Sequence, residues 1–328
     1  MTVLLILLAL LVITLTVLPV WRTTLWWVRL MDFPRLQIAV LGVGVVAALL
    51  LSGAAQDAFT WLVLICVSCA TLWQLNWIWR FFPGAPIQSP AATGAEDAAD
   101  EVSFVTANVL QENRTAEGLL RIIADADPDF VLAVETDEWW VTRLTEDLDD
   151  RYPHRFCVPQ SNGYGMSVFS KLELEDVEIQ HLLDDAIPSI RMNVVLRSGQ
   201  RILVHAVHPQ PPRIGQDSLK RDIELDRLAT IVARHHHPAV VLGDLNDVGW
   251  STTTQRFLET SNLRDPRRGR GLYNTYPAAM PGLRYPLDHI FISHHFALRK
   301  LRVLPSYSSD HLPLFAALRL STSALPKK

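Results

Sequence analysis

The pattern of hydrophobic residues divides the chain into a strongly apolar first part and a mixed second part. Three apolar runs without a charged side chain occupy residues 3–20, 36–55 and 58–79. Each run is close to the roughly 20 residues that a helix needs to cross a bilayer. Tryptophans stand near the ends of the runs, where they favour the membrane–water interface: Trp21, Trp26, Trp27, Trp73, Trp77 and Trp79. The pattern predicts a membrane region over residues 1–81 with three transmembrane helices.

The first run has an alternative interpretation as a cleaved signal peptide. It lacks a basic n-region and a clear small-residue cleavage site, and two further apolar runs follow it. Three membrane helices are therefore the better interpretation. The stretch between the first two runs, residues 21–35, carries tryptophans and arginines and suits a segment that lies along the membrane surface.

The second part of the chain has the alternation of a soluble α/β domain. Residues 82–100 are rich in Pro, Gly, Ala and acidic side chains, which predicts a flexible linker. From 101 to 320, short β-rich runs alternate with helical patterns, including a strand over 102–110 and a helix over 218–235. Residues 321–328 form a short polar tail.

Composition and charge narrow the class of partner. The chain has 328 residues, 49% of them hydrophobic, and a formal net charge of −4. Mild acidity argues against a broad nucleic-acid-binding surface, although a local basic patch stays open. The one basic run, residues 264–270, suits a solvated loop and a phosphate or lipid-headgroup contact equally well. Three cysteines, Cys66, Cys69 and Cys157, imply no disulfide framework.

Polar side chains that bind metals or carry protons recur at the ends of predicted strands. They are Asn108, Glu135, His208, Asp244, Asn246, Asp288, Asp310 and His311. Each alone is explained by a turn, a helix cap or a salt bridge. Their joint occurrence in one domain favours a site, because open α/β sheets present chemistry at the carboxyl ends of their strands.

The chemistry that these side chains suit is hydrolysis of a phosphate ester. Carboxylate and amide oxygens are hard ligands that suit Mg²⁺ or Mn²⁺ better than zinc, and imidazole carries protons near neutral pH. The run His235–His237 is expected to be a solvated loop instead, because three consecutive side chains cannot all face one ion. Asp247 is expected to form a turn.

Seven short motifs, in order, resemble the endonuclease/exonuclease/phosphatase superfamily: TANV, VET, GYGMSVFSK, HAVHP, GDLND, LDHIF and SDHLP. The resemblance covers about residues 102–320, and it implies a four-layer α/β sandwich of two mixed sheets flanked by helices. The superfamily includes DNase I-like nucleases, AP endonucleases, sphingomyelinases and inositol-phosphate phosphatases. Val134 stands where the usual acidic motif has Gln, which points away from the nuclease branches.

For the metal, the resemblance implies that Glu135 is the principal Mg²⁺ ligand, with Mn²⁺ as an alternative ion. It implies that Asn108 and Asp310 support the metal or the phosphate.

For proton transfer, the resemblance implies that Asp244 handles the proton of the nucleophilic water or of the leaving group. Asn246 would hold Asp244 and the phosphate oxygens. His311, paired with Asp288, would be the general base or a phosphate contact. His208 would protonate the leaving oxygen or bind phosphate.

The combination of membrane helices with this domain resembles the membrane-anchored members associated with teicoplanin-type resistance, which are linked to undecaprenyl lipid phosphate metabolism. The resemblance implies a phosphatase or phosphodiesterase that acts on a lipid-linked phosphate, with membrane lipids as its partners. A membrane-tethered endo- or exonuclease acting on DNA or RNA is the alternative. A catalytically silent interaction protein is a third, against which the intact set of metal and acid–base residues argues.

The charge pattern of the first loop and the resemblance imply opposite sides of the membrane for the catalytic domain. Arg22, Arg29 and Arg35 against Asp32 make the first loop basic, and three spans would then place the catalytic domain in the cytoplasm. The membrane-anchored relatives imply the extracytoplasmic side of the cell membrane, which is the expectation adopted here.

Overall fold

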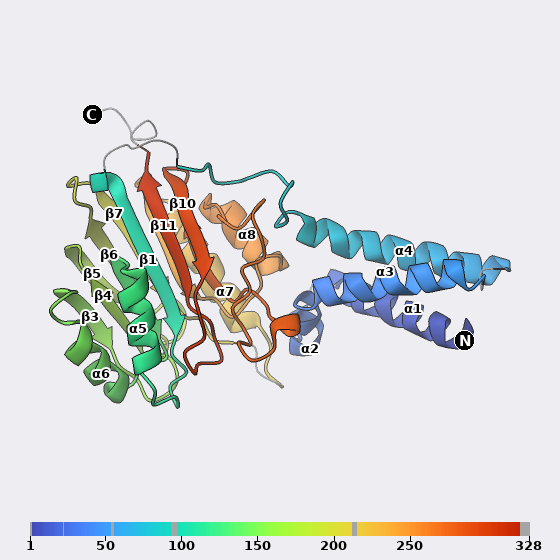
Figure 1. Ribbon diagram of the computed structural model, residues 1–328, viewed down its shortest axis with the longest axis horizontal. Coiled ribbons are helices and arrows are strands. Elements are labelled where there is room, and N and C mark those ends of the chain that lie inside the picture. The colour runs from blue at the N-terminus through green and yellow to red at the C-terminus, as the bar shows by residue number, and fades with distance from the viewer. Residues whose placement is uncertain (1, 22, 54–55, 93–97, 212–214, 322–328) are drawn as a thin grey trace. The chain divides into compact units, whose positions relative to one another are not determined.

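The computed structural model describes residues 2–21, 23–53, 56–92, 98–211 and 215–321. The described residues form two compact units. The first, here called the helical unit, takes in the chain up to Ala85 together with residues 215–219. The second, the sandwich unit, takes in 86–211 and the chain from Lys220 onward. Figure 1 shows the N-terminal helices in blue and the strands of the sandwich unit in teal to red.

Helices occupy all three apolar runs of the helical unit. They are α1 (Thr2–Val17) with η1 (Leu18–Val20), α2 (Trp26–Arg29) with η2 (Leu30–Asp32), α3 (Arg35–Leu51) and α4 (Ala58–Trp79). The helices Thr2–Val20 and Ala58–Trp79 are each long and apolar enough to cross a membrane. The segments Trp26–Asp32 and Arg35–Leu51 are bent by 69° and add a third span if the bent pair counts as one. The structure thus gives two or three candidate spans, and the predicted end of the second run, residues 54–55, lies outside the described residues.

A buried polar network holds the bend between η2 and α3. Asp32 accepts hydrogen bonds from Arg29 at 3.2 Å and from Arg35 at 2.5 Å. Arg35 also donates to Gln74 of α4 at 3.0 Å, and Gln74 donates to Thr16 of α1 at 3.0 Å. Because charges among apolar helices are costly unless paired, this network ties the bend to both neighbouring helices.

The sandwich unit consists of two mixed sheets, as the sequence predicts. The six-stranded sheet has the order β10-β11-β1-β2-β4-β3 and the five-stranded sheet the order β5-β6-β7-β8-β9. The strands are β1 (Glu101–Asn108), β2 (Phe130–Val134), β3 (His154–Val158), β4 (Met166–Ser170), β5 (Leu174–Gln180), β6 (Ser189–Val195), β7 (Arg201–Val207), β8 (Ala239–Asp244), β9 (Asp288–Ile292), β10 (Phe296–Val303) and β11 (Leu314–Leu320). Each sheet contains one parallel pair, β1–β2 and β7–β8, among antiparallel neighbours.

Helices cover the outer face of each sheet, which completes the predicted four layers. The helices α5 (Glu117–Ala126) and α6 (Glu138–Leu148) pack on the first sheet, and α7 (Leu219–Ala233) and α8 (Thr252–Ser261) pack on the second. Strand β1 shows how the sequence specifies this arrangement. Val102 and Phe104 belong to the core between the sheets, whereas Val105 and Ala107 belong to the core under α5 and α6. The strand is therefore apolar on both faces, as a central strand must be.

Part of the segment predicted as a linker packs on the edge strand β10. Leu298 donates its N–H to Pro90 O at 2.8 Å and accepts from Ala92 N at 2.9 Å. Gln88 Oε1 accepts from Asp265 N at 2.9 Å. Residues 88–92 thus cover an otherwise open sheet edge, while 93–97 lie outside the described residues.

Candidate active site

The carboxyl ends of the two parallel strand pairs carry four of the predicted site residues. Asn108 ends β1 and Glu135 follows β2 in the first sheet, while His208 follows β7 and Asp244 ends β8 in the second. The strand register places Asn108 opposite Val134. The two sheets therefore present their polar strand ends to each other at one edge of the sandwich.

Asn108 joins the two sheets at this edge. Its Nδ2 donates to Glu135 Oε1 at 2.7 Å and to Asp244 Oδ2 at 3.1 Å, and its Oδ1 accepts from Leu110 N at 3.0 Å. His208 Nε2 lies 3.9 Å from Glu135 Oε1 and 3.9 Å from Asp244 Oδ2. One amide, two carboxylates and one imidazole thus share a single buried volume.

Local backbone conformation explains two of the motifs. Gly243 precedes Asp244 with φ +141°, and a Cβ there would collide with the Val207 carbonyl oxygen of the neighbouring strand. Glu135 has φ +66° and Asn246 has φ +52°, so both are non-glycine residues in the left-handed region. Such conformations are rare and gather at functional sites, where the surroundings hold them.

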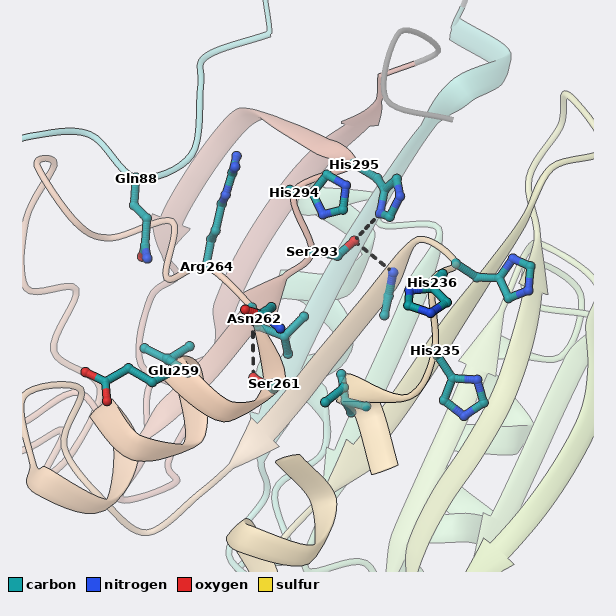
Figure 2. Close-up of a pocket in the computed structure, with 16 residues that line it drawn as sticks. Gln88, His235, His236, Glu259, Ser261, Asn262, Arg264, Ser293, His294 and His295 are labelled. Carbon is teal, nitrogen blue, oxygen red and sulfur yellow. Dashed lines mark hydrogen bonds between the residues drawn. The ribbon is translucent and has the colours of Figure 1, made fainter. Parts of the chain in front are cut away.

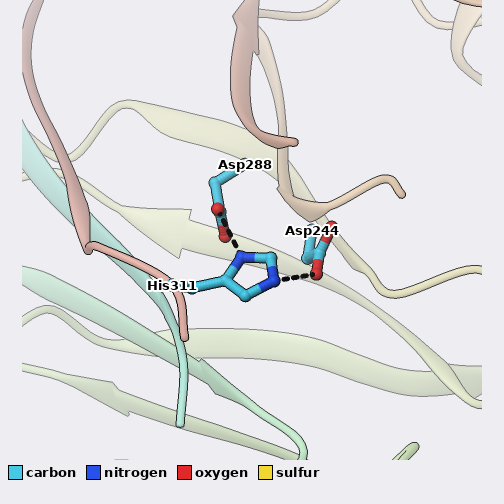
Figure 3. Close-up of side chains that lie close together, drawn as sticks. All are labelled: Asp244, Asp288 and His311. Carbon is cyan, nitrogen blue, oxygen red and sulfur yellow. Dashed lines mark hydrogen bonds and ion pairs between the residues drawn. The ribbon is translucent and has the colours of Figure 1, made fainter. Parts of the chain in front are cut away.

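His311 lies between two buried aspartates that face each other across β8 and β9 (Figure 3). Asp244 is the register partner of Asp288. His311 Nδ1 donates to Asp288 Oδ2 at 2.8 Å, and its Nε2 lies 3.5 Å from Asp244 Oδ2. Burial opposes protonation of the ring, but the charges of Asp288 and Asp244 and the hydrogen bond to Asp288 outweigh it and raise the pKa of His311 to about 10. With this pKa the ring is protonated at neutral pH, and each of its nitrogens faces a carboxyl group.

Burial shifts the pKa values of the other titratable groups of the site. Desolvation raises the pKa of Glu135 to about 7, against the hydrogen bond from Asn108, and the charge of Asp244 adds to the rise. Burial likewise raises the pKa of Asp244, against the charge of His311. Burial lowers the pKa of His208. Opposed shifts of this kind are frequent at catalytic sites.

Asn246 contacts the cluster through its backbone, and Asp310 lies next to the cluster in sequence. The N–H of Asn246 donates to Asp244 Oδ1 at 2.9 Å, while its side-chain amide donates to Pro209 O at 3.0 Å. Asp310 precedes His311, and its carboxylate lies 3.5 Å from the Ser309 hydroxyl. Within the described residues, no hydrogen bond or ion pair joins the Asp310 carboxylate to Glu135.

Comparison with known proteins assigns the fold and the family. A sequence model of the Endonuclease/Exonuclease/phosphatase family matches residues 105–311. The chain belongs to this family. Members of the family hydrolyse phosphate ester bonds and generally depend on a divalent metal ion. No curated protein sequence matches the chain.

Solved structures of other proteins share the fold. An endonuclease/exonuclease/phosphatase from Beutenbergia cavernae has a TM-score of 0.55 at 18% identity, over 68% of this chain and 72% of that one. The human Nocturnin catalytic domain, with bound sulfate anion, has a TM-score of 0.55 at 20% identity, over 69% and 96%. TDP2 from D. rerio, complexed with single strand DNA product, has a TM-score of 0.56 at 15% identity, over 68% and 100%.

The site of this family member fits a hard divalent cation at Glu135. The Glu135 carboxylate is largely buried, shares the Asn108 amide with the second carboxylate of Asp244, and accepts from Gln111 N at 3.3 Å. No lysine or arginine among the described residues pairs with it. A cation would relieve both the desolvation and the repulsion from Asp244, and carboxylate and amide oxygens are the ligands that Mg²⁺ and Mn²⁺ prefer.

A second group of possible ligands fits a metal less well. Ligand atoms of Asp244, Asp288 and His311 lie within 4.8 Å of one another (Figure 3). Both ring nitrogens of His311, however, face carboxylates, at 2.8 Å and 3.5 Å. A protonated ring has no lone pair to offer, so this triad is better described as an ion-paired acid–base group.

Several residues that support the site were not predicted from the sequence. The Tyr307 and Ser309 hydroxyls both donate to the Asn108 carbonyl oxygen, the latter at 2.7 Å. The Tyr276 ring centroid lies 4.7 Å from that of His311. Gln111 accepts from Gly163 N at 2.8 Å through its side chain. Only Ser309, within the SDH motif, had a sequence signal, because the others act through loops whose approach depends on the tertiary fold.

The basic run at 264–270 is largely packed inside the sandwich unit. Arg267 is buried and donates to Asp265 Oδ2 at 2.8 Å. Arg270 donates to the Ser89 carbonyl oxygen at 2.6 Å. These two arginines therefore have a structural role. They form neither a solvated loop nor a phosphate or lipid-headgroup contact. Arg264 differs, because its side chain lines a pocket.

Proposed function

We propose that this family member is a membrane-anchored, Mg²⁺-dependent phosphoesterase that hydrolyses a phosphate ester or pyrophosphate of a lipid-linked substrate. The observation that carries the phosphoesterase assignment is the buried group in which Asn108 bridges Glu135 and Asp244 while His311 bridges Asp244 and Asp288. A proton acceptor, Asp244, and a positively charged ring, His311, thus lie next to each other. Both are close to the oxygen atoms of Glu135 and Asn108 that would hold a metal ion.

Each residue of the group has a role that follows from its contacts. Asp244 would accept the proton of the attacking water, because the Asn246 N–H and the Asn108 amide fix both carboxylate oxygens. His311 would bring its positive charge close to the phosphoryl oxygens, with Asp288 holding the ring in that orientation.

The remaining residues would bind the phosphate and the metal. His208, within 3.9 Å of both carboxylates, would contact the phosphate. Glu135 and Asn108 would hold the ion, with Asp310 as a further oxygen donor. When bound, Mg²⁺ would neutralise phosphoryl and leaving-group charge.

A loop beside the site supports a substrate in the membrane. Tyr276 and Tyr285 pair at its base, and the Tyr276 ring lies against His311. Its tip carries two large apolar side chains, Met280 and Leu283, which are 51% and 47% exposed. Single exposed apolar residues are ordinary. Two of them on one loop at the catalytic histidine, in a chain with membrane-length helices, support contact with lipid.

We place the catalytic unit on the extracytoplasmic side of the cell membrane. Two of the arginines that make the first loop basic, Arg29 and Arg35, are buried against Asp32. The positive-inside rule still counts these arginines toward a cytoplasmic loop, so the orientation that we propose rests on the resemblance to the membrane-anchored members of the family. A reporter enzyme active only outside the cytoplasm, fused after the last strand, should be active. An active cytoplasmic reporter instead would reverse this orientation.

The proposed activity is tested by phosphate release from a panel of substrates with the full-length protein in detergent. The panel holds polyprenyl phosphates and pyrophosphates, inositol phosphates, DNA and RNA. We expect turnover of lipid phosphates that stops on chelation and returns with Mg²⁺ or Mn²⁺, and a Glu135→Gln variant that no longer responds to the added metal. Full activity in excess chelator would refute the metal role. Far faster cleavage of DNA or RNA would establish the nuclease alternative, and no hydrolysis at all would leave an interaction protein.

A further inference from the structure

A second polar pocket lies at the start of β8, the opposite end of that strand from Asp244. It has a volume of about 740 Å³ (Figure 2). Ala239, the first residue of β8, lines it. The polar side chains around it include Gln88, His235, His236, His237, Glu259, Arg264, His294 and His295. It shares no residue with the candidate active site.

The Ser293 hydroxyl contacts one ring nitrogen of His295, which also lines the pocket. The Ser293 hydroxyl oxygen accepts from Ala239 N at 3.0 Å and lies 3.0 Å from His295 Nδ1. A hydroxyl that accepts from a backbone N–H still has a hydrogen to donate, and in the Nε2–H tautomer of His295 that hydrogen goes to Nδ1. In this tautomer His295 offers the pocket a hydrogen-bond donor at Nε2.

Arg264 brings a fixed positive charge to the same pocket. Its backbone is held at the end of β9, where it exchanges hydrogen bonds with Ile292 at 2.7 and 3.0 Å. Its guanidinium has no hydrogen bond or ion pair to any described residue, since the adjacent carboxylate of Asp265 is used by Arg267. Figure 2 shows the Arg264 side chain between Gln88 and His294.

The other polar groups of the pocket are mainly donors as well. Gln88 uses its carbonyl oxygen to accept from Asp265 N, which leaves its amide nitrogen to donate. Burial lowers the pKa of His295 to about 4, and repulsion from His294, His237 and Arg264 adds to the shift. Glu259 is the one carboxylate among the lining residues, and it is exposed. The Arg264 guanidinium would repel a metal cation, whereas an oxyanion would meet the positive charge of Arg264 and the hydrogen-bond donors around it.

We propose that this pocket binds a phosphate-type oxyanion, with the Arg264 guanidinium, His295 Nε2–H and the Gln88 amide as its donors and the neighbouring histidines at its rim. The anion has two sources, inorganic phosphate and the phosphate of a lipid headgroup, which present the same oxygens. The sequence predicts that His235–His237 form a solvated loop. In the structure these three histidines also line the pocket.

The test is NMR of the full-length protein in detergent micelles with isotope-labelled histidine, because each imidazole reports its own site. The signals are assigned by single His→Gln variants and followed during titration with inorganic phosphate. We expect saturable shifts of the His294 and His295 signals. Arg264→Gln should weaken this binding by about tenfold or more, since it removes a charge-assisted contact. The matched control, Arg121→Gln on the surface of α5, should leave it unchanged.

Two further titrations, with a short-chain lipid phosphate and with Zn²⁺, distinguish the possible ligands. Dihexanoyl phosphatidic acid in place of phosphate identifies a lipid headgroup if it shifts the same signals at lower concentration than inorganic phosphate. The absence of a phosphate-dependent shift at His294 and His295 would overturn the proposal. So would an unchanged affinity in Arg264→Gln. Binding of Zn²⁺ alone at these signals, without any response to phosphate, would replace it with a metal site.

Discussion

Two aspartates of the GDLND motif have different surroundings. The Asp244 carboxylate lies within the polar cluster beside Asn108 and His311. The Asp247 carboxylate accepts from Ser251 Oγ at 2.5 Å and lies 3.6 Å from an Arg221 nitrogen. In the proposed mechanism the first acts on the substrate, whereas the second ties the loop to α7 and α8.

Asparagine substitutions separate the two functions. Asp244→Asn should lower turnover by about 10² to 10⁴, because a proton acceptor is lost. Asp247→Asn should destabilise the fold by about 1–3 kcal/mol, because it weakens a buried charged contact. Steady-state rates and thermal unfolding of both variants measure the difference. Near-normal turnover in Asp244→Asn would show that the motif is only a turn.

Glu224 of α7 predicts a pH dependence of stability outside the active site. It is buried, and burial, with the charge of Asp184, raises its pKa to about 7 from 4.5. The folded protein therefore keeps a proton that the unfolded chain releases between about pH 4.5 and 7. Over this window the free energy of unfolding falls as pH rises.

Glu224→Gln should remove that fall. At pH 8 the free energy of unfolding of the variant should exceed that of the parent by on the order of 1–3 kcal/mol. Below pH 4.5 the titration of residue 224 should cause no difference between the two proteins. Denaturant unfolding of the full-length protein at several pH values is the measurement. Glu173→Gln, at an exposed position, is the control. An equal pH profile for parent and Glu224→Gln would contradict the assignment.

At the scale of elements, the loop from Tyr276 to Tyr285 connects the site to its surroundings. Replacing both Met280 and Leu283 with Ser should slow turnover of a bilayer-embedded substrate by on the order of tenfold, because apolar area is lost from the lipid contact. Turnover of a short soluble ester should stay unchanged. Ile179→Ser on β5, also an exposed apolar position at 43%, is the control. Equal loss on both substrates would mean that the loop supports His311 and not the membrane contact.

At the scale of the whole molecule, the helical unit should concentrate the enzyme on its substrate and not take part in the chemistry. A chain that begins at Pro86 keeps every candidate catalytic residue and the pairing of residues 88–92 with β10. It should hydrolyse a soluble phosphate ester at a rate similar to that of the full-length protein. On substrate in vesicles it should be slower by more than about tenfold, because tethering raises effective concentration.

A shorter chain tests whether residues 88–92 stabilise the truncated protein. A chain that begins at Glu101 loses both backbone partners of Leu298 and should melt at a lower temperature than the Pro86 chain. If the Pro86 chain acts equally well on soluble and vesicle-bound substrate, the helices only localise the enzyme, and the case for a lipid substrate weakens.

Local patterns were sufficient for the layers of the fold and for the identity of most polar strand ends. The alternation within β1 and the apolar run of β8 follow from which faces must be buried, and such patterns are visible without tertiary contacts. Asn108, Glu135 and Asp244 stand out for the same reason, since polar groups after buried strands need a partner or a function. The helices of the first apolar runs follow from hydropathy alone.

The tertiary structure decided which of these residues meet and what their charges become. Asn108 reaches Asp244 across 136 positions of sequence, and His311 enters between two aspartates that only the β8–β9 register brings face to face. Arg267 and Arg264 belong to the same basic run, yet Arg267 is buried against Asp265, whereas the guanidinium of Arg264 has no hydrogen bond or ion pair to a described residue. Hydropathy and spacing are properties of neighbouring residues, whereas pairing, burial and pKa depend on residues that are distant in sequence, because electrostatic and hydrogen-bond energies are set by distance and solvent access.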